Sequence, residues 1–149
     1  MNRFVLLAAL ALPLTSNAGE PFTGTDYSGT YDCTGIDSKE GDYTGVVTLQ
    51  FNPEQSSGAY GAYNFKLVVP DYGTYPGQAV SLGKTLAIHF ALTDSRSKDY
   101  GTGIATVSKN RHGKLTFHKF YYEPEFKGGN NGVEDCVRRQ GNEANTPIK

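Results

Sequence analysis

The stretch Ser28-Gly29-Thr30-Tyr31-Asp32-Cys33-Thr34-Gly35 decides the fold, because it carries one of only two cysteines in the sequence. The other, Cys136, lies close to the end of the chain. In an exported protein an even pair of cysteines is most simply a disulfide, which here would tie the first strand to the last. Closing a loop of about 100 residues stabilises a fold by ~4–5 kcal/mol. Two buried free thiols are the alternative.

The N-terminal residues have the pattern of a secretory signal peptide. Asn2-Arg3 supplies a positive end, residues 4–12 form an unbroken apolar run, and Ser16-Asn17-Ala18 places small residues at a cleavage site. The apolar run is shorter than the roughly 20 residues that span a bilayer, and no later stretch is apolar enough to anchor the chain. We therefore predict a signal peptide at 1–18, a periplasmic or secreted bacterial protein, and no membrane span.

The remainder is predicted to form one domain. About 130 residues suit a single domain at 19–139, followed by a flexible polar tail at 140–149. The 14 Lys and Arg and the 15 Asp and Glu are interspersed, with a net charge of −1. Because nucleic-acid binding normally needs a basic stripe, we expect no nucleic-acid partner. We also expect a monomer.

Alternating apolar residues predict an all-β fold. Large apolar side chains recur at every second position within residues 43–51, 59–69 and 85–92, and no segment shows an apolar repeat at helical spacing. About eight short strands separated by turns indicate an antiparallel meander that closes into a small barrel. A link between the first and last strands favours the barrel, and a β-sandwich is the alternative.

The opening of the first predicted strand carries a family resemblance. Gly29-Thr30-Tyr31 resembles the Gly-x-Trp/Tyr opening of the calycin barrels, the lipocalin and avidin group, although this chain has no tryptophan. The chain is also similar to small exported bacterial β-barrel families, some of which inhibit lysozymes. The resemblance implies a lipocalin-like barrel architecture, and no inhibitory residue carries over to this sequence.

Aromatic residues are the strongest indication of function. The sequence holds 10 Tyr and 8 Phe, and tyrosine supplies the rigid, amphipathic area that suits binding surfaces. We therefore predict an exported, non-enzymatic binding module that uses loops at 70–77 and 123–132. Its partner would be a protein, as for an inhibitor of a lysozyme or toxin, or a small apolar ligand in the barrel. The predicted binding residues are Tyr72, Tyr75, Tyr121, Tyr122 and Phe126. The alternative is that antiparallel strands simply favour tyrosine.

No catalytic, metal or cofactor site is predicted. The three histidines lack ligand spacing, and the sequence has no nucleophile elbow and no phosphate-binding glycine loop. Glu123 and Glu125 are expected to point the same way at a solvated strand end. Two other hypotheses stay open, namely a small periplasmic hydrolase using His118 or Glu123 and a structural envelope protein without a pocket.

An Asp-Tyr pair followed closely by glycine occurs four times, at Asp26-Tyr27, Asp42-Tyr43, Asp71-Tyr72 and Asp99-Tyr100. We interpret the pair as a turn device, in which the aspartate caps the turn and the tyrosine enters the strand. A ring of tyrosines around one barrel mouth is the functional alternative.

Overall fold

A computed structural model describes residues 20–140 of the chain, and eight strands make up most of them. The predicted signal peptide, and the predicted tail beyond Gln140, lie outside the described residues. The strands are β1 (Gly29–Asp37), β2 (Gly41–Ser57), β3 (Tyr60–Val69), β4 (Gly73–Leu82), β5 (Thr85–Ala91), β6 (Tyr100–Lys109), β7 (Leu115–Glu123) and β8 (Asn130–Arg138). Two 3₁₀ turns, η1 (Ser95–Ser97) and η2 (Phe126–Gly128), complete the described elements, and no helix in this part of the chain is long and apolar enough to cross a membrane.

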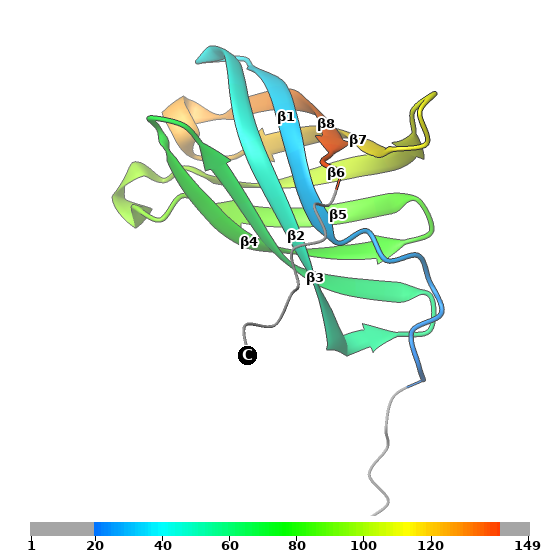
Figure 1. Ribbon diagram of the computed structural model, residues 1–149. Coiled ribbons are helices and arrows are strands. Elements are labelled where there is room, and N and C mark those ends of the chain that lie inside the picture. The colour runs from blue at the N-terminus through cyan, green and yellow to red at the C-terminus, as the bar shows by residue number, and fades with distance from the viewer. Residues whose placement is uncertain (1–19, 141–149) are drawn as a thin grey trace, which may run out of the picture.

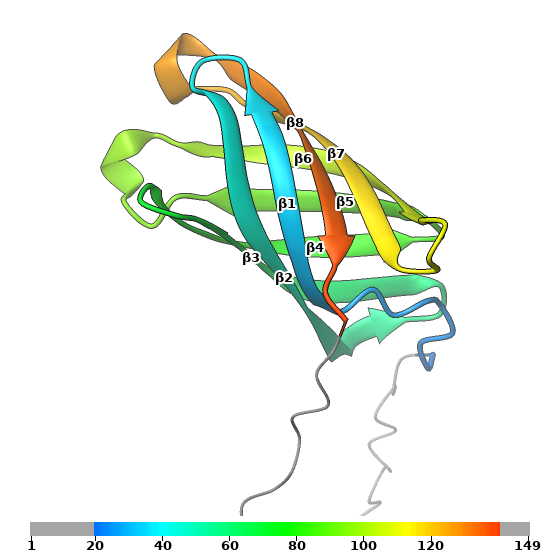
Figure 2. The ribbon, with the colours of Figure 1, turned by 45° about the horizontal axis from the view of Figure 1, so that its top comes forward.

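The strands form a closed antiparallel barrel in sequence order, as Figures 1 and 2 show. β1 pairs with β8 and thereby closes the sheet. Cys33 lies opposite Cys136 in this pairing, and the two sulfurs are bonded to each other. The predicted all-β meander barrel and the disulfide are therefore confirmed, and the sandwich alternative is wrong.

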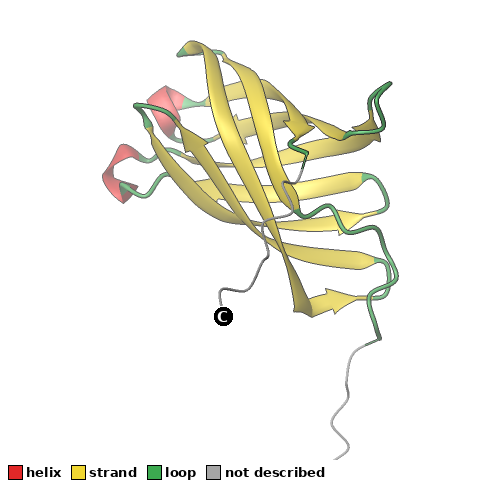
Figure 3. Ribbon diagram, viewed as in Figure 1, coloured by secondary structure: helices red, strands yellow, loops and turns green. Residues whose placement is uncertain are grey.

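The barrel has two different ends. We call the mouth the end formed by the β1–β2, β3–β4, β5–β6 and β7–β8 connections, and the base the opposite end. Both 3₁₀ turns belong to the mouth, where Figure 3 shows them on the same side of the molecule. The mouth therefore has the two longest connections, whereas the hairpins of the base are short.

Tyrosine side chains close the base of the barrel. Tyr31 is fully buried and donates its hydroxyl to the carbonyl of Tyr27 at 2.7 Å. The Tyr63 hydroxyl accepts the backbone N–H of Tyr27 at 3.1 Å, and the Tyr27 hydroxyl reaches the Gly83 carbonyl at 2.7 Å. The chain before β1 is thus held across the base.

Inward-facing positions alternate along the strands as the sequence predicts, but two predicted loops are partly strand. β4 begins at Gly73, inside the predicted loop 70–77, and β8 begins at Asn130, inside the predicted loop 123–132. Pro76 is tolerated in β4 because it lies where that strand pairs with β3 alone, since pairing with β5 starts at Gly77. Residues 73–77 therefore help to build the barrel wall.

Candidate functional site: a polar cavity at the barrel mouth

A cavity of about 70 Å³ lies inside the mouth of the barrel. Its walls combine aromatic rings with carboxyl groups, and its thirteen lining residues come from six strands and the mouth connections. Four of the five predicted binding residues line it, namely Tyr72, Tyr75, Tyr121 and Phe126. Tyr122 does not, because strand alternation places it on the outer face of β7, where it is half exposed. The prediction from the sequence therefore includes most of the aromatic residues that line the cavity. It also includes Tyr122, which lies on the outer face of β7.

Glycines facing inward make room for two of the rings. A side chain at Gly35 would overlap the Tyr43 ring, and a side chain at Gly132 would overlap Tyr121. Both glycines are buried and belong to the strands that the disulfide joins. Small residues on β1 and β8 thus leave room inside the barrel for the large tyrosines of β2 and β7.

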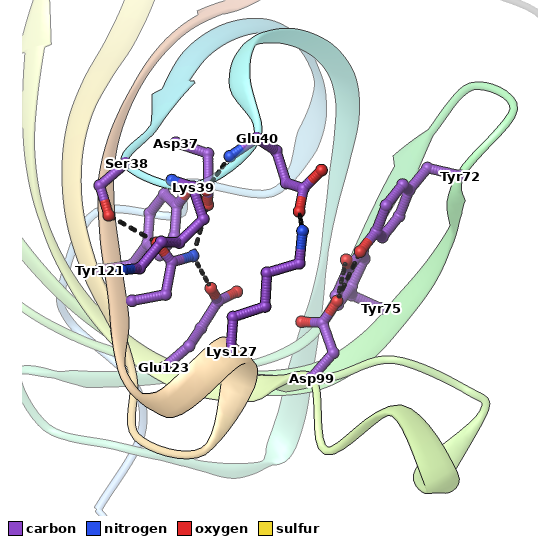
Figure 4. Close-up of polar contacts among 11 residues, drawn as sticks. Asp37, Ser38, Lys39, Glu40, Tyr72, Tyr75, Asp99, Tyr121, Glu123 and Lys127 are labelled. Carbon is purple, nitrogen blue, oxygen red and sulfur yellow. Dashed lines mark hydrogen bonds and ion pairs between the residues drawn. The ribbon is translucent and has the colours of Figure 1, made fainter.

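Asp37 is held by four hydrogen bonds at one side of the cavity (Figure 4). Its Oδ2 accepts the Tyr121 hydroxyl at 2.7 Å and the Asn130 amide at 2.6 Å. Its Oδ1 accepts the backbone N–H groups of Lys39 and Glu40 at 2.8 and 2.9 Å. Burial opposes ionisation, but these donors outweigh it and lower the pKa of Asp37. Asp37 is therefore an ionised, fully bonded carboxylate.

Asp99 lies across the cavity from Asp37, and only one of its two carboxylate oxygens has hydrogen-bond partners. Its Oδ2 accepts the Tyr75 hydroxyl at 2.8 Å and the Tyr72 hydroxyl at 3.2 Å, and Figure 4 shows both rings directed at it. Its Oδ1 is buried and has no hydrogen-bond partner. Burial is the main reason that the pKa of Asp99 is raised. Asp99 is thus no turn cap, contrary to the interpretation of the Asp-Tyr pair at this position.

Glu123 points into the cavity, so the expectation of a solvated pair with Glu125 is wrong. Glu123 is 5% exposed, whereas Glu125 is exposed and pairs with Lys98 outside the barrel. The chain turns after β7 at Pro124, and the two carboxyls therefore separate. Burial raises the pKa of Glu123 to about 7, and the charges of Asp99 and Asp37 add to this, although a hydrogen bond from Asn130 opposes it. Glu123 is therefore half protonated near neutral pH.

A buried ion pair lies deeper in the barrel. The Lys119 ammonium contacts the Glu134 carboxylate, and both side chains are at most 1% exposed. Three rings surround the ammonium, with centroids 5.3 Å (Tyr121), 5.4 Å (Phe90) and 5.6 Å (Phe65) from Nζ. Opposite charge and aromatic faces together replace the water that this ammonium has lost.

Five polar residues that face into the barrel were not predicted as site residues from the sequence: Asp37, Asp99, Lys119, Asn130 and Glu134. Strand alternation would have found most of them. Lys119 shares its face of β7 with Phe117 and Tyr121, and Glu134 shares its face of β8 with Cys136. The signal that identifies them is a charged residue at a position where the alternation along the strand predicts an apolar, inward-facing side chain.

The histidines lie outside the cavity. All three are exposed, and Nδ1 of His118 pairs with Asp135 at 2.8 Å on the outer face of the barrel. Among residues 20–140, the one group with metal-ligand spacing is Cys33, Glu134 and Cys136, whose sulfurs are bonded to each other. The hydrolase hypothesis therefore has Glu123 as its remaining candidate.

The fold and the site define a closed eight-stranded antiparallel barrel with a polar, tyrosine-lined cavity at one mouth. No family model, no curated protein and no solved structure matches the chain. The function is therefore argued from the cavity alone.

The raised pKa of Glu123 predicts a pH-dependent gain in stability for Glu123→Gln. The folded protein holds this proton up to a pH of about 7, and the unfolded chain loses it near 4.5. The wild type therefore loses stability as the pH rises between these values, by on the order of 3 kcal/mol. Glutamine cannot ionise, so the variant should be more stable than the wild type at pH 8 and should have little advantage at pH 4.5.

Urea denaturation at the two pH values measures this gain. Glu54→Gln is the matched control, because Glu54 is exposed on β2. An equal gain at both pH values, or an equal gain in the control, would contradict a buried carboxyl at position 123.

Proposed function

We propose that the chain is an exported binding module that takes a small ligand into the cavity at the mouth of its barrel. The observation that carries this proposal is the direction of the polar groups. Asp99 and Glu123 are aimed into a cavity, where an apolar filled core would be more stable, and one Asp99 oxygen has no hydrogen-bond partner. A buried carboxylate oxygen without a partner is explained by a ligand that would supply one.

Burial also supports a small ligand over a protein partner. Tyr75, Tyr121 and Phe126 are between 4% and 8% exposed, so a protein surface docking on the mouth would not reach most of their area. A ligand that enters the barrel would contact all three. The carboxyl groups among them favour a ligand with a polar head over a wholly apolar one.

Export is supported by the disulfide together with the signal-like N-terminal sequence. Disulfides persist in oxidising compartments such as the periplasm or the extracellular medium. Cys33 and Cys136 form one here, and the protein is proposed to be a periplasmic or secreted monomer with a calycin-like role as a carrier.

Tyr72→Trp tests cavity binding with a clean optical signal, because the native chain has no tryptophan. Position 72 is half exposed at the mouth, where the native ring stacks on Tyr75 with centroids 6.4 Å apart. We expect members of a defined library of small amines, acids, alcohols and sugars to change the tryptophan fluorescence of this variant saturably.

Tyr60→Trp is the matched control, since Tyr60 is as exposed but starts β3 at the base. A ligand of the cavity should leave the fluorescence of the control variant unchanged. If no library member changes the fluorescence of the Tyr72→Trp protein alone, and calorimetry detects none binding to the wild-type protein, the proposed function is wrong.

A hydrolase is the second candidate, because Glu123 has a pKa of about 7 beside Asp99 in a cavity. Two carboxyls that cleave a glycoside stand roughly 5–9.5 Å apart with the sugar between them. The Asn130 nitrogen donates to both Glu123 and Asp37, so an amide bridges these two carboxyls where a sugar would have to bind. Turnover of a 4-nitrophenyl glycoside that Glu123→Gln abolishes would favour the hydrolase.

A further inference from the structure

We infer that the ligand of the mouth cavity is a small protonated amine, whose ammonium group binds between the Asp99 and Glu123 carboxyls while its apolar part lies against the tyrosine rings. The inference rests on the proposed function and deepens it, because it names the chemical class of the ligand.

Without a cation, the buried carboxyls around the cavity are relieved only by taking up a proton, as the raised pKa values of Asp99 and Glu123 indicate. Five carboxyl groups belong to this end of the barrel: Asp37, Glu40, Asp99, Glu123 and Glu134. Two lysines neutralise two of them, since Lys119 pairs with Glu134 and Lys127 pairs with Glu40 (Figure 4). Asp37, Asp99 and Glu123 receive hydrogen bonds from neutral groups only. Burying three carboxyls without a cation is costly, so the site favours a positively charged ligand.

Asp99 identifies where the cation would bind. It is 3% exposed, it lines the cavity, and its Oδ1 lacks any donor. Tyr72 and Tyr75 hold the other oxygen and so fix the carboxyl in place. Glu123 lines the same cavity, and the charge of Asp99 helps to raise the pKa of Glu123. An ammonium has three N–H donors, which suits two neighbouring carboxyls with free lone pairs.

The aromatic wall suits the same ligand. Tyr75 packs edge-on against Phe90 with centroids 6.0 Å apart, and Phe90 packs edge-on against Tyr121 at 5.9 Å. The barrel already holds one ammonium among aromatic faces, that of Lys119. Cation–π attraction is strongest where water is excluded, so a second ammonium nearer the mouth would gain from the same rings.

Binding would be coupled to proton release. Glu123 and its neighbour Asp99, whose pKa is also raised, are left as the groups whose charge depends on pH, because Asp37 is ionised and burial keeps Tyr43, Tyr75 and Tyr121 protonated. Lys119, Glu134, Lys127 and Glu40 are engaged in ion pairs. Because Glu123 loses its proton at a pH of about 7, amine affinity should rise as the pH increases from 5 to 8.

Three probes of one shape and different charge test the inference: benzylamine, benzyl alcohol and benzoate. Calorimetric titration into the wild-type protein at pH 8 should give an affinity for benzylamine at least tenfold above that for the other two. Asp99→Asn and Glu123→Gln should each weaken benzylamine binding at least tenfold. Glu54→Gln on the outer surface should not change it.

The outcomes separate the inference from the proposed function. Benzyl alcohol or benzoate binding as tightly as benzylamine would overturn the amine inference and leave cavity binding intact. Unchanged benzylamine affinity in both carboxyl variants, or affinity that falls from pH 5 to pH 8, would also overturn it. If none of the three probes binds, the amine site is wrong, and the library decides cavity binding separately.

Discussion

Replacing Lys119 by methionine, with Glu134 left in place, is expected to lower the free energy of unfolding by about 3–5 kcal/mol. Methionine has a similar length, so the packing against the surrounding rings is largely kept. The change removes the one cation among the described residues that contacts Glu134. The Glu134 carboxylate is fully buried, and no other group donates a hydrogen bond to it. An unpaired buried carboxylate must either remain charged at high cost or take up a proton.

The double variant Lys119→Met/Glu134→Leu is the matched control for this ion pair. With both charges removed, the part of the interior around positions 119 and 134 becomes apolar, and replacing buried pairs in this way is often neutral or stabilising by about 1–4 kcal/mol. Urea denaturation of the two variants and the wild type measures the difference. If the single and the double variant lose equal stability, the effect is one of packing and the ion pair does not explain it. A mild effect of Lys119→Met would contradict the burial of the pair.

The fold was predictable because it follows from alternation and from one covalent link. Tyr63, Phe65 and Leu67 face inward as their spacing predicts, and Cys33 meets Cys136 where the first and last strands close the barrel. The alternation can be read within each strand and the disulfide from two cysteines, so both can be predicted without knowing how neighbouring strands are aligned. Pro76 and the glycines around it misled the loop prediction, because a proline costs a strand nothing where no neighbour pairs with its missing N–H.

The cavity was only partly predictable, because it depends on which residues the register brings together. Asp37, Asp99 and Glu123 come from three different strands or strand ends, and sequence spacing does not reveal that they share one mouth. Glu123 continues the inward phase of Phe117, Lys119 and Tyr121, so its orientation could have been predicted. Asp99 lies just before β6, where alternation gives no guide, and only the tertiary structure brings it to Tyr72 and Tyr75.

Reducing the Cys33–Cys136 disulfide is expected to lower the free energy of unfolding by about 4–5 kcal/mol. The bond closes a loop of 103 residues and so restricts almost the whole described barrel in its unfolded state. The reduced protein should still fold, because the β1–β8 pairing extends over seven residue pairs on its own. Urea denaturation of oxidised and reduced protein, with thiols quantified after each measurement, gives the difference.

Cys33→Ala/Cys136→Ala separates the cross-link from the reductant and should lose a similar amount. Equal stability of the oxidised, reduced and alanine forms would show that the bond does not restrict the unfolded chain. The disulfide and the Lys119 variants should be measured apart, because a Glu134 carboxylate oxygen lies within 4.8 Å of both sulfurs. Groups this close share an environment, so their effects on stability are not expected to add. A variant that combines the cysteine and Lys119 changes would measure the coupling between barrel closure and the buried ion pair.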